Sequence, residues 1–566
     1  MRQFTLILGL LAGCWGQPPP VPPTGVIPDS ALLRPDSVYP FIRIDLNTIT
    51  FAAHILPFWE KLKSNGRKVR VLHVGDSHIQ GDIQGREIRH RLYKVWGVGG
   101  RGYVFPYHVA GTSSAYDYVS SGEGQWLSAR SVQLQPLLPL GVTGIAIGTY
   151  DPTAQWEIRW NPAYQPAAKP GARLRLLTRV LRSGIRCSLW VNTSAVPQVR
   201  ELPVGYALTE FSLTEPLMAL RGGWGWEGED SLSYAELQGI FIEEGTTGIT
   251  WYSMGISGAR LGDWSSLPLL KESLRLLQPD LIVIDLGTND LYAPNATLAN
   301  FRQAIEAAID TIRAVSPEIS ILLTTPQDFY RSMRALPLLE GASRLIRWVA
   351  SQRGVAVWDA YTILGPIREW RLAGLASSDM VHLTVAGYAL KGQLFAAALL
   401  RSYELYRRGA LTDVESEKAG LTPPSEAFSA PVPIPLTPSI TQFGGNTTVA
   451  TYTPPRPSYI THKVKPGETI GQIAQRYGTT VAAIRQANGL RGNLIKAGQV
   501  LRIPTGRKSS APSNSKKATP RTHTVKAGES LWSIAQKYGV SVHALRKANG
   551  LSSRASIHPG QKLIIP

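Results

Sequence analysis

Short apolar runs alternate with amphipathic helical patterns in two stretches of the chain. Four runs are almost continuously apolar, as expected of strands buried on both faces of a sheet: 68–74, 281–286, 319–325 and 355–358. Segments 298–315 and 342–353 repeat apolar residues with the helical period. The alternation predicts an α/β domain with an open parallel sheet and helices on both of its faces.

The pattern changes between residues 115 and 245. Helical periodicity is weak there, and short strand-like segments separated by Gly and Pro take its place: 142–147, 155–160, 173–181, 185–191 and 236–242. Closely spaced short strands with turn residues between them are typical of an all-β sandwich. We therefore expect a β domain inserted into the α/β domain, which resumes near residue 246.

The last hundred residues contain an internal repeat. Val464-Lys-Pro-Gly-Glu-Thr-Ile470 corresponds to Val525-Lys-Ala-Gly-Glu-Ser-Leu531, and Ala487-Asn-Gly-Leu490 corresponds to Ala548-Asn-Gly-Leu551. Segments rich in Pro, Ser and Thr precede and separate the two copies, which is typical of linkers. The predicted organisation is a leader (1–17), a Pro-rich tether (18–35), the α/β domain (36–114 and 246–410), the insertion (115–245), a linker (411–459), one repeat (460–505), a short linker (506–521) and the second repeat (522–566).

The N-terminus carries features of an export signal. Arg2 precedes an apolar run over residues 4–12 that is too short to span a bilayer. The run ends in Leu11-Ala12-Gly13-Cys14, which resembles the bacterial lipobox and implies lipidation of Cys14. The alternative is an ordinary secretory signal that contains a cysteine. If Cys14 is lipidated, Cys187 has no partner and should be a buried, small apolar residue.

The charge of the chain is concentrated at its C-terminal end. The formal net charge is +19, and residues 451–566 contain 19 Lys and Arg against two acidic residues, Glu468 and Glu529. Such a basic region could bind nucleic acid, an anionic membrane or an anionic wall polymer. The export signal argues against nucleic acid. Two cysteines in the whole chain exclude a disulfide-stapled scaffold.

Four polar motifs contain the residue types of serine catalysis. They are His73-Val-Gly-Asp-Ser-His78, Gly255-Ile-Ser-Gly-Ala-Arg260, Gly287-Thr-Asn-Asp290 and Asp379-Met-Val-His382. A serine needs an adjacent base, a group that orients the base, and donors for the oxyanion. The first and third motifs follow buried strands directly, at the edge of the sheet where α/β active sites lie. Asp and His three residues apart stand one turn from each other, so both can face a serine.

In their order, the four motifs resemble those of the SGNH (GDSL-like) hydrolases. The resemblance implies a three-layer α/β/α, flavodoxin-like fold, with Ser77 as nucleophile, His382 as base and Asp379 orienting it. The implied oxyanion donors are the Ser77 N–H, the Gly258 N–H and the Asn289 side chain, with Gly255 as the alternative glycine. Asp76 would shape the turn, and His73, His78, Gln80 and Arg260 are more readily explained as structural polar residues. No cluster has metal-ligand spacing, so neither a metal nor another cofactor is expected.

The repeats resemble LysM modules, small βααβ units that bind glycans containing N-acetylglucosamine. The opening Val-Lys-x-Gly-Glu and the closing Gly-Gln-x-Leu-x-Ile-Pro carry this resemblance. It implies a shallow glycan groove formed in the first repeat by Gly467, Glu468, Thr469, Ile470, Asn493, Leu494 and Ile495. In the second repeat the corresponding residues are Gly528, Glu529, Ser530 and Leu531, with 556–558.

Together these resemblances predict an exported serine esterase of the cell envelope. The sandwich inserted between the first two motifs also resembles that of bacterial peptidoglycan O-acetylesterases, which implies hydrolysis of acetyl esters on N-acetylmuramic acid. The alternatives are an acetylesterase for another polysaccharide, a lipase, and a non-catalytic peptidoglycan-binding lipoprotein. Acetyl transfer in place of hydrolysis also remains open, because a fold does not determine a substrate.

Overall fold

The structure is a computed structural model, and it divides into two compact units, Met1–Arg456 and Pro457–Pro566. In the first unit it describes residues 39–64, 66–161, 168–228 and 232–429. In the second unit the described residues are 459–464, 468, 470, 473, 484, 487–488, 490, 495, 498–504, 521–525, 548–549 and 561–565. Cys14 and the tether lie outside the described residues.

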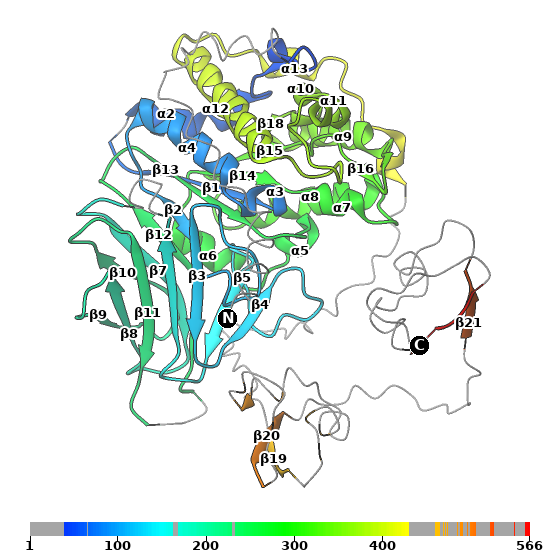
Figure 1. Ribbon diagram of the computed structural model, residues 1–566. Helices are drawn as coiled ribbons and strands as arrows, with labels where there is room; N and C mark the ends of the chain where they lie inside the picture. Colours follow the sequence, from blue (N-terminus) through cyan, green and yellow to red (C-terminus); the bar gives the residue numbers. More distant parts are fainter. Residues whose placement is uncertain are drawn as a thin grey trace, which may run out of the picture. The chain divides into compact units, whose positions relative to one another are not determined.

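A five-stranded parallel sheet forms the centre of the first unit (Figure 1). Its spatial order is β13-β1-β14-β15-β18, which is 2-1-3-4-5 in chain order. This is the flavodoxin-like order, so the predicted fold class is confirmed. Four of the strands lie where the apolar runs predict them, and β13 is the first element after the insertion. The bounds are β1 (Val69–Gly75), β13 (Ile249–Gly255), β14 (Leu281–Asp285), β15 (Ser320–Thr324) and β18 (Ala356–Trp358).

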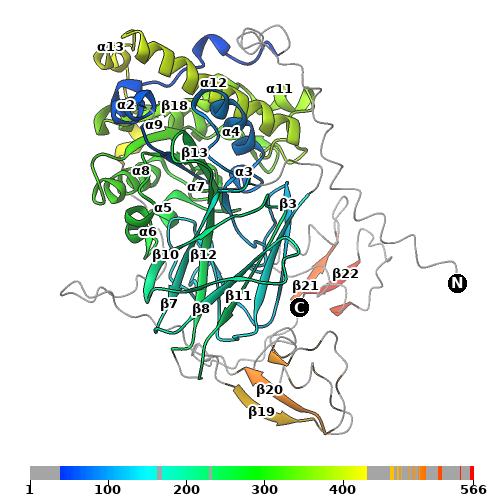
Figure 2. The same ribbon diagram turned by 90° about the vertical axis from the view of Figure 1, so that its left-hand side faces the viewer.

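Both faces of this sheet are covered by helices (Figures 1 and 2). Because side chains alternate along a strand, Val69 and Val71 of β1 enter one core, whereas Leu72 and Val74 enter the other. The first core is shared with α2 (Leu56–Ser64), α4 (Ile83–Trp96) and α12 (Val385–Arg407). The second is shared with α6 (Leu270–Leu277), α8 (Leu298–Arg313) and α9 (Leu338–Arg353).

Short helices occupy the loops around the sheet. At its carboxyl edge are α3 (Ser77–Gln80) after β1, α5 (Leu261–Ser265) after β13, α7 (Thr288–Tyr292) after β14 and α10 (Ala360–Leu364) after β18. Others are η2 (Ile44–Leu46), η3 (Ala52–Ile55) and α11 (Ile367–Leu372). Among the described residues, no helix is both long enough and apolar enough to cross a membrane.

The insertion is a two-sheet β-sandwich, as predicted, but it begins earlier than residue 115. One sheet has the order β10-β7-β12-β5-β4, with β2 also pairing with β12, and the other has the order β3-β6-β11-β8-β9. Strand β2 (Gly102–Val104) is three residues long and follows a Gly-rich segment, so it leaves no alternating pattern in the sequence. The other bounds are β3 (Tyr118–Glu123), β4 (Leu127–Arg130), β5 (Ile145–Thr149), β6 (Gln155–Trp160), β7 (Arg173–Val180), β8 (Arg186–Val191), β9 (Gln198–Glu201), β10 (Gly205–Ser212), β11 (Ala219–Gly225) and β12 (Ala235–Glu243).

The sandwich and the α/β domain share one hydrophobic core. Trp264 Nε1 donates to the carbonyl of Val142 over 3.0 Å, and the Arg101 guanidinium pairs with both Asp82 and Asp117 at 2.7 Å. These contacts link the sandwich to the segments that follow β1 and β13. Cys187 is buried inside the sandwich, and burial raises the pKa of its thiol to about 12.

The folded part of the first unit extends past residue 410, where the sequence predicted a linker. Two short elements, α13 (Val414–Lys418) and η4 (Ser425–Phe428), pack against it. A Glu417 carboxylate oxygen accepts a hydrogen bond from the Phe51 N–H over 2.7 Å, and Arg302 lies 4.4 Å from the ring centre of Phe428. Helices of four or five residues are too short to show a periodic pattern, which explains the misplaced boundary.

Each C-terminal repeat contains an antiparallel strand pair at its ends. In the first repeat β19 (Tyr459–Lys463) pairs with β20 (Val500–Pro504), and in the second β21 (Arg521–Thr524) pairs with β22 (Lys562–Ile565). Asn488 fastens the closing strand by exchanging hydrogen bonds with the backbone of Arg502, and Asn549 does the same with Ile564. The repeated Asn of the Ala-Asn-Gly-Leu motif is therefore structural.

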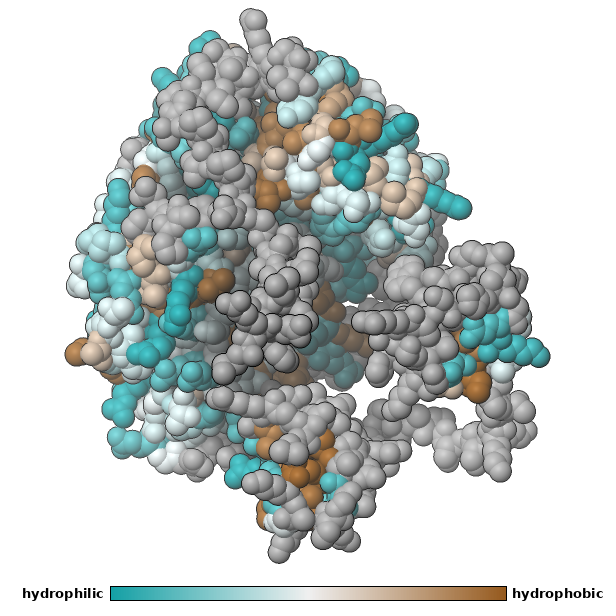
Figure 3. Space-filling view, viewed as in Figure 1, coloured by the Kyte–Doolittle hydropathy of each residue, from teal (hydrophilic) through white to brown (hydrophobic). Residues whose placement is uncertain are grey.

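The visible surface of the first unit is mainly hydrophilic. In Figure 3, hydrophilic side chains cover much of the described surface on this face, with hydrophobic residues in smaller areas between them.

Candidate active site

Ser77 stands on a tight turn between β1 and α3. Asp76 begins the helix, since its Oδ1 accepts a hydrogen bond from the His78 N–H over 2.9 Å. Two glycines make this turn possible. A Cβ on Gly75 would lie 2.2 Å from Ile79 Cγ1, and a Cβ on Gly255 would lie 2.2 Å from the Gln80 nitrogen. The turn leaves Ser77 half-exposed at the carboxyl edge of the sheet.

The structure brings Ser77, His382 and Asp379 into one hydrogen-bonded line. Ser77 Oγ lies 2.9 Å from His382 Nε2, and His382 Nδ1 lies 2.7 Å from Asp379 Oδ2. The nucleophile and base are 305 residues apart in the chain. In this arrangement the imidazole can remove the serine proton while the carboxylate orients it and stabilises the resulting positive charge.

The loop that carries Asp379 and His382 is a turn and not a helix. Met380 between them has a φ of 59°, in the left-handed region. Asp379 Oδ1 accepts hydrogen bonds from the backbone N–H groups of Val381 and His382, both over 3.0 Å. Burial would raise the pKa of Asp379, but the hydrogen bonds from His382 and from the backbone outweigh it and lower the pKa. The carboxylate therefore stays ionised beside the imidazole.

The loop after β13 presents Gly258 to solvent near this line. Gly258 has a φ of 87°, and among the described residues its N–H donates to no acceptor. Gly255, the alternative donor, is a buried residue of β13 whose Cα packs against α3. An exposed N–H without a partner suits an oxyanion donor better than a packed one.

Asn289 is held beside Asp76. Its Nδ2 donates to Asp76 Oδ2 over 3.1 Å and to the carbonyl of Ala259 over 3.0 Å. Both amide protons are therefore engaged, and donation to a substrate oxygen would require one of these hydrogen bonds to shift. Because Ala259 follows Gly258 directly, the Asn289 amide also fixes the position of the loop that carries the Gly258 N–H.

Asp76 is fully buried, and burial raises its pKa to about 7, although the hydrogen bond from the His78 N–H opposes the rise. An unfolded aspartate releases its proton near pH 4. Between these values the native state binds the extra proton, so the free energy of unfolding falls as the pH rises from about 4 to about 7.

The corresponding prediction concerns Asp76→Asn. As the pH rises from about 4.5 to about 6.5, the free energy of unfolding of the parent should fall relative to that of the variant. The expected fall is up to about 1.4 kcal/mol for each pH unit. Urea unfolding followed by tryptophan fluorescence measures this difference. Glu318→Gln, at an exposed position with no ion pair among the described residues, is the control. If the free energies of unfolding of Asp76→Asn and of the parent changed with pH in the same way, the effect of burial on the Asp76 pKa would be contradicted.

Four further polar residues of the motifs have structural roles. His73 is buried beneath the sheet edge beside Trp251, and Arg260 pairs with Asp263 at 2.8 Å. His78 packs its ring 5.3 Å from that of His382, and burial lowers its pKa to about 3, so a neutral ring adjoins the proposed base. Gln80 Oε1 accepts from the Ser257 N–H over 2.6 Å and so positions the Gly258 loop.

A buried ion pair lies at the carboxyl end of β14, just before the helix that carries Asn289. Asp285, the last residue of β14, lies 3.5 Å from Lys391 Nζ on α12 and accepts from Thr324 Oγ1 over 2.8 Å. Burial would raise the Asp285 pKa, but Lys391 and the surrounding donors lower it well below its usual range. Nothing in the local sequence indicated this pair, because its partners are about a hundred residues apart.

The predicted glycan residues of the repeats are only partly described. Glu468 Oε2 lies 2.8 Å from His462 Nε2, and Ile470 is buried in the small core of the first repeat together with Ile473 and Leu501. Ile495 packs against that core. The other predicted residues lie outside the described residues: Gly467, Thr469, Asn493, Leu494, Gly528, Glu529, Ser530 and Leu531.

Residues 212–390 match the GDSL-like lipase/acylhydrolase family, and residues 462–504 and 523–566 each match the LysM domain. The GDSL-like match includes Gly258, Asn289, Asp379 and His382. It begins at residue 212, within the sandwich, and therefore does not include Ser77.

A solved structure described as a peptidoglycan O-acetylesterase shares the fold. The two superpose with a TM-score of 0.52 at 24% sequence identity, over 62% of this chain and 96% of that chain.

Wall enzymes are among the curated relatives. An autolysin of Enterococcus faecalis is 37% identical over 103 residues, which are 18% of this chain and 14% of the autolysin. An N-acetylmuramoyl-L-alanine amidase of Staphylococcus epidermidis is 44% identical over 103 residues, which are 18% of this chain and 30% of the amidase. This chain thus spans less than a third of the length of these relatives.

Proposed function

Because the chain carries a GDSL-like lipase/acylhydrolase domain and two LysM domains, we propose that it is a serine esterase that removes O-acetyl groups from peptidoglycan. The observation that carries the proposal is the line from Ser77 through His382 to Asp379. The fold shared with a described peptidoglycan O-acetylesterase supports the choice of ester.

The first half of the reaction forms an acetyl-enzyme. His382 Nε2 takes the proton of Ser77 Oγ as that oxygen attacks the acetyl carbonyl, and Asp379 stabilises the imidazolium. The Ser77 and Gly258 N–H groups and the Asn289 amide stabilise the oxyanion. His382 then returns the proton to the sugar hydroxyl as the C–O bond of the ester breaks.

The second half releases acetate. Water enters after the sugar leaves, and His382 removes a proton from it as it attacks the acetyl carbonyl. Collapse of the second tetrahedral intermediate breaks the bond to Ser77 Oγ, which recovers its proton from His382. The half-exposed position of Ser77 gives both a polymer and water access to the ester.

The LysM domains would hold the enzyme on its polymer. Two linked weak sites raise the effective concentration of the catalytic domain at the wall. The 19 basic residues of segment 451–566 would add attraction to anionic wall material, most strongly at low salt. We propose further that the protein is exported and held in the cell envelope by a lipid on Cys14.

Asn289→Ala tests the oxyanion assignment. Loss of the amide should lower kcat for an aryl acetate by about 10²- to 10³-fold with a smaller change in KM, because the amide would stabilise the transition state more than the ground state. Steady-state kinetics measures both constants. Asn295→Ala, at an exposed position six residues away, is the control and should behave like the parent.

The substrate is tested by measuring acetate release from three materials: O-acetylated peptidoglycan, the same peptidoglycan after alkaline removal of its esters, and acetylated xylan. We expect release from the first at a rate well above that from xylan, and none from the second. Faster release from xylan would assign the enzyme to another polysaccharide. Release only from an aryl acetate would retain the serine esterase and reject both glycans.

A further inference from the structure

A small hairpin lies against the loop that carries Asp379 and His382. It follows β15 at the carboxyl edge of the sheet and consists of β16 (Tyr330–Arg331) and β17 (Arg334–Ala335). The Tyr330 N–H donates to the carbonyl of Met380 over 2.8 Å. Met380 stands between Asp379 and His382, so the hairpin adjoins the proposed catalytic loop directly.

The same hairpin reaches the helix that carries Asn289. Arg331 Nη1 donates to the carbonyl of Ala293 over 2.8 Å, immediately after α7, and the rings of Tyr292 and Phe329 stack at 6.2 Å. The hairpin therefore bridges the two loops that supply the base and the oxyanion amide. Substrate bound at Ser77 would extend past these loops.

Two arginines stand at opposite positions of this hairpin. Arg331 and Arg334 are direct cross-strand partners, an arrangement in which like charges repel. Within the described part of the chain, neither guanidinium forms an ion pair with a carboxylate. The carbonyls of Tyr292 and Ala293 accept hydrogen bonds from Arg331, but no carboxylate among the described residues balances either positive charge.

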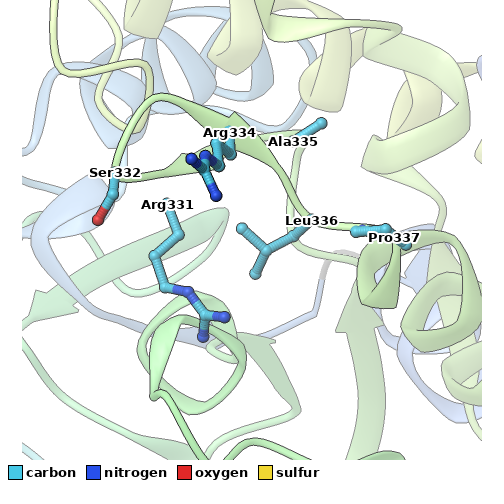
Figure 4. Close-up of a pocket in the computed structure, with 6 residues that line it drawn as sticks. All are labelled: Arg331, Ser332, Arg334, Ala335, Leu336 and Pro337. Atoms are coloured by element: carbon cyan, nitrogen blue, oxygen red, sulfur yellow. The ribbon is translucent and has the colours of Figure 1, made fainter.

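The turn between the two arginines adjoins a cavity. Ser332 and Met333 form the two-residue turn and both have positive φ, 51° and 64°, as such a hairpin turn requires. A cavity of about 420 Å³ opens at the base of the hairpin, lined by Arg331, Ser332, Arg334, Ala335, Leu336 and Pro337 (Figure 4). Its size suits part of one sugar residue and its acidic substituent.

We propose that Arg331 and Arg334 form a carboxylate-binding subsite of the active site. The subsite takes an acid group attached to the sugar whose acetyl ester is cleaved, through charge-assisted hydrogen bonds of the kind guanidinium groups form with carboxylates. The proposal rests on the proposed function, since the lactyl group of N-acetylmuramic acid ends in a free carboxylate where no stem peptide is attached. Where a stem peptide is attached, that carboxyl group is an amide and the peptide supplies the carboxylates. Neutral acetylated glycans lack both groups.

The test uses inhibition of aryl acetate hydrolysis, which does not depend on turnover of peptidoglycan. N-acetylmuramic acid, N-acetylmuramoyl dipeptide and N-acetylglucosamine are compared as inhibitors. The parent should bind at least one of the two acids about tenfold or more tightly than N-acetylglucosamine. Preference for N-acetylmuramic acid identifies the lactyl carboxylate, whereas preference for the dipeptide identifies a peptide carboxylate.

Variants at Arg334 test whether the hairpin causes the preference for acidic inhibitors. Arg334 is exposed, and within the described part of the chain no hydrogen bond or ion pair links its side chain to α7. Arg334→Ala should therefore remove the preference for the acid, Arg334→Glu should reverse it and Arg334→Lys should keep part of it. Arg344→Ala, at an exposed position of α9, should leave the ratio of inhibition constants as in the parent.

Two outcomes separate this proposal from the proposed function. Equal inhibition of the parent by acids and by N-acetylglucosamine, with acetate still released from peptidoglycan, would overturn the subsite alone. A preference for the acid that depends on Arg334, without acetate release from peptidoglycan, would support the subsite and reject the substrate. An acid preference that survives both Arg334→Ala and Arg334→Glu would also overturn the subsite.

Discussion

Ser77→Ala should lower kcat for an aryl acetate by about 10⁴-fold or more and leave substrate binding nearly unchanged. The expected loss is large because the variant removes the atom that would become acetylated, and the rest of the line cannot replace it. His382→Ala should cost about as much, and the double variant little more than either single one, since residues that act as a unit are not additive.

The control for Ser77→Ala is an exposed serine outside the site. Ser183→Ala, in the turn before β8, should match the parent in kcat and KM. Retention of more than a tenth of the parental rate by Ser77→Ala, with single and double variants behaving additively, would contradict a nucleophilic role for Ser77.

Gly255→Ala should be the most damaging single-methyl change near the site. The added Cβ would lie 2.2 Å from the Gln80 nitrogen, 2.6 Å from the Ile79 carbonyl carbon and 2.7 Å from the Asp76 carbonyl oxygen. All three are backbone atoms of the turn that carries Ser77, so rotation of a side chain cannot relieve the clash. We expect a loss of about 3 kcal/mol in unfolding free energy, together with loss of activity.

Gly258→Ala is the matched comparison. A Cβ there would meet only Val132 Cγ1, at 3.5 Å, so the cost is limited to the positive φ, about 1 kcal/mol. Chemical unfolding gives both values. Equal losses at the two positions would contradict the packing of β13 against α3.

The sequence predicted the α/β domain well because strands buried on both faces leave continuous apolar runs. β1 and β14 follow such runs closely, and the helix α8 begins at the residue the pattern predicts. Short elements leave no such pattern: β2 is buried but only three residues long, and α13 buries none of its five residues. Their positions depend on contacts with distant residues, as with Glu417 and Phe51.

The candidate site shows the same limit. Ser77, Asn289, Asp379 and His382 stand in recognisable motifs, and the structure brings them to one edge of the sheet. The hydrogen bond from Asn289 to Asp76, the anchoring of Ser257 by Gln80 and the Arg331–Arg334 pair arise only when separate loops meet in space. A search for polar residues at the carboxyl ends of buried strands could have found Asp285, but not its partner Lys391.

The most direct test of the account is to trap the acetyl-enzyme on its polymer substrate. The full chain is mixed with O-acetylated peptidoglycan, quenched in acid within the first turnovers, digested and examined by mass spectrometry. The account predicts one acetyl group on the peptide that contains Ser77, and none when the peptidoglycan has been stripped of its esters. Acetate release without acetylation of Ser77, or acetylation of another residue, would contradict it.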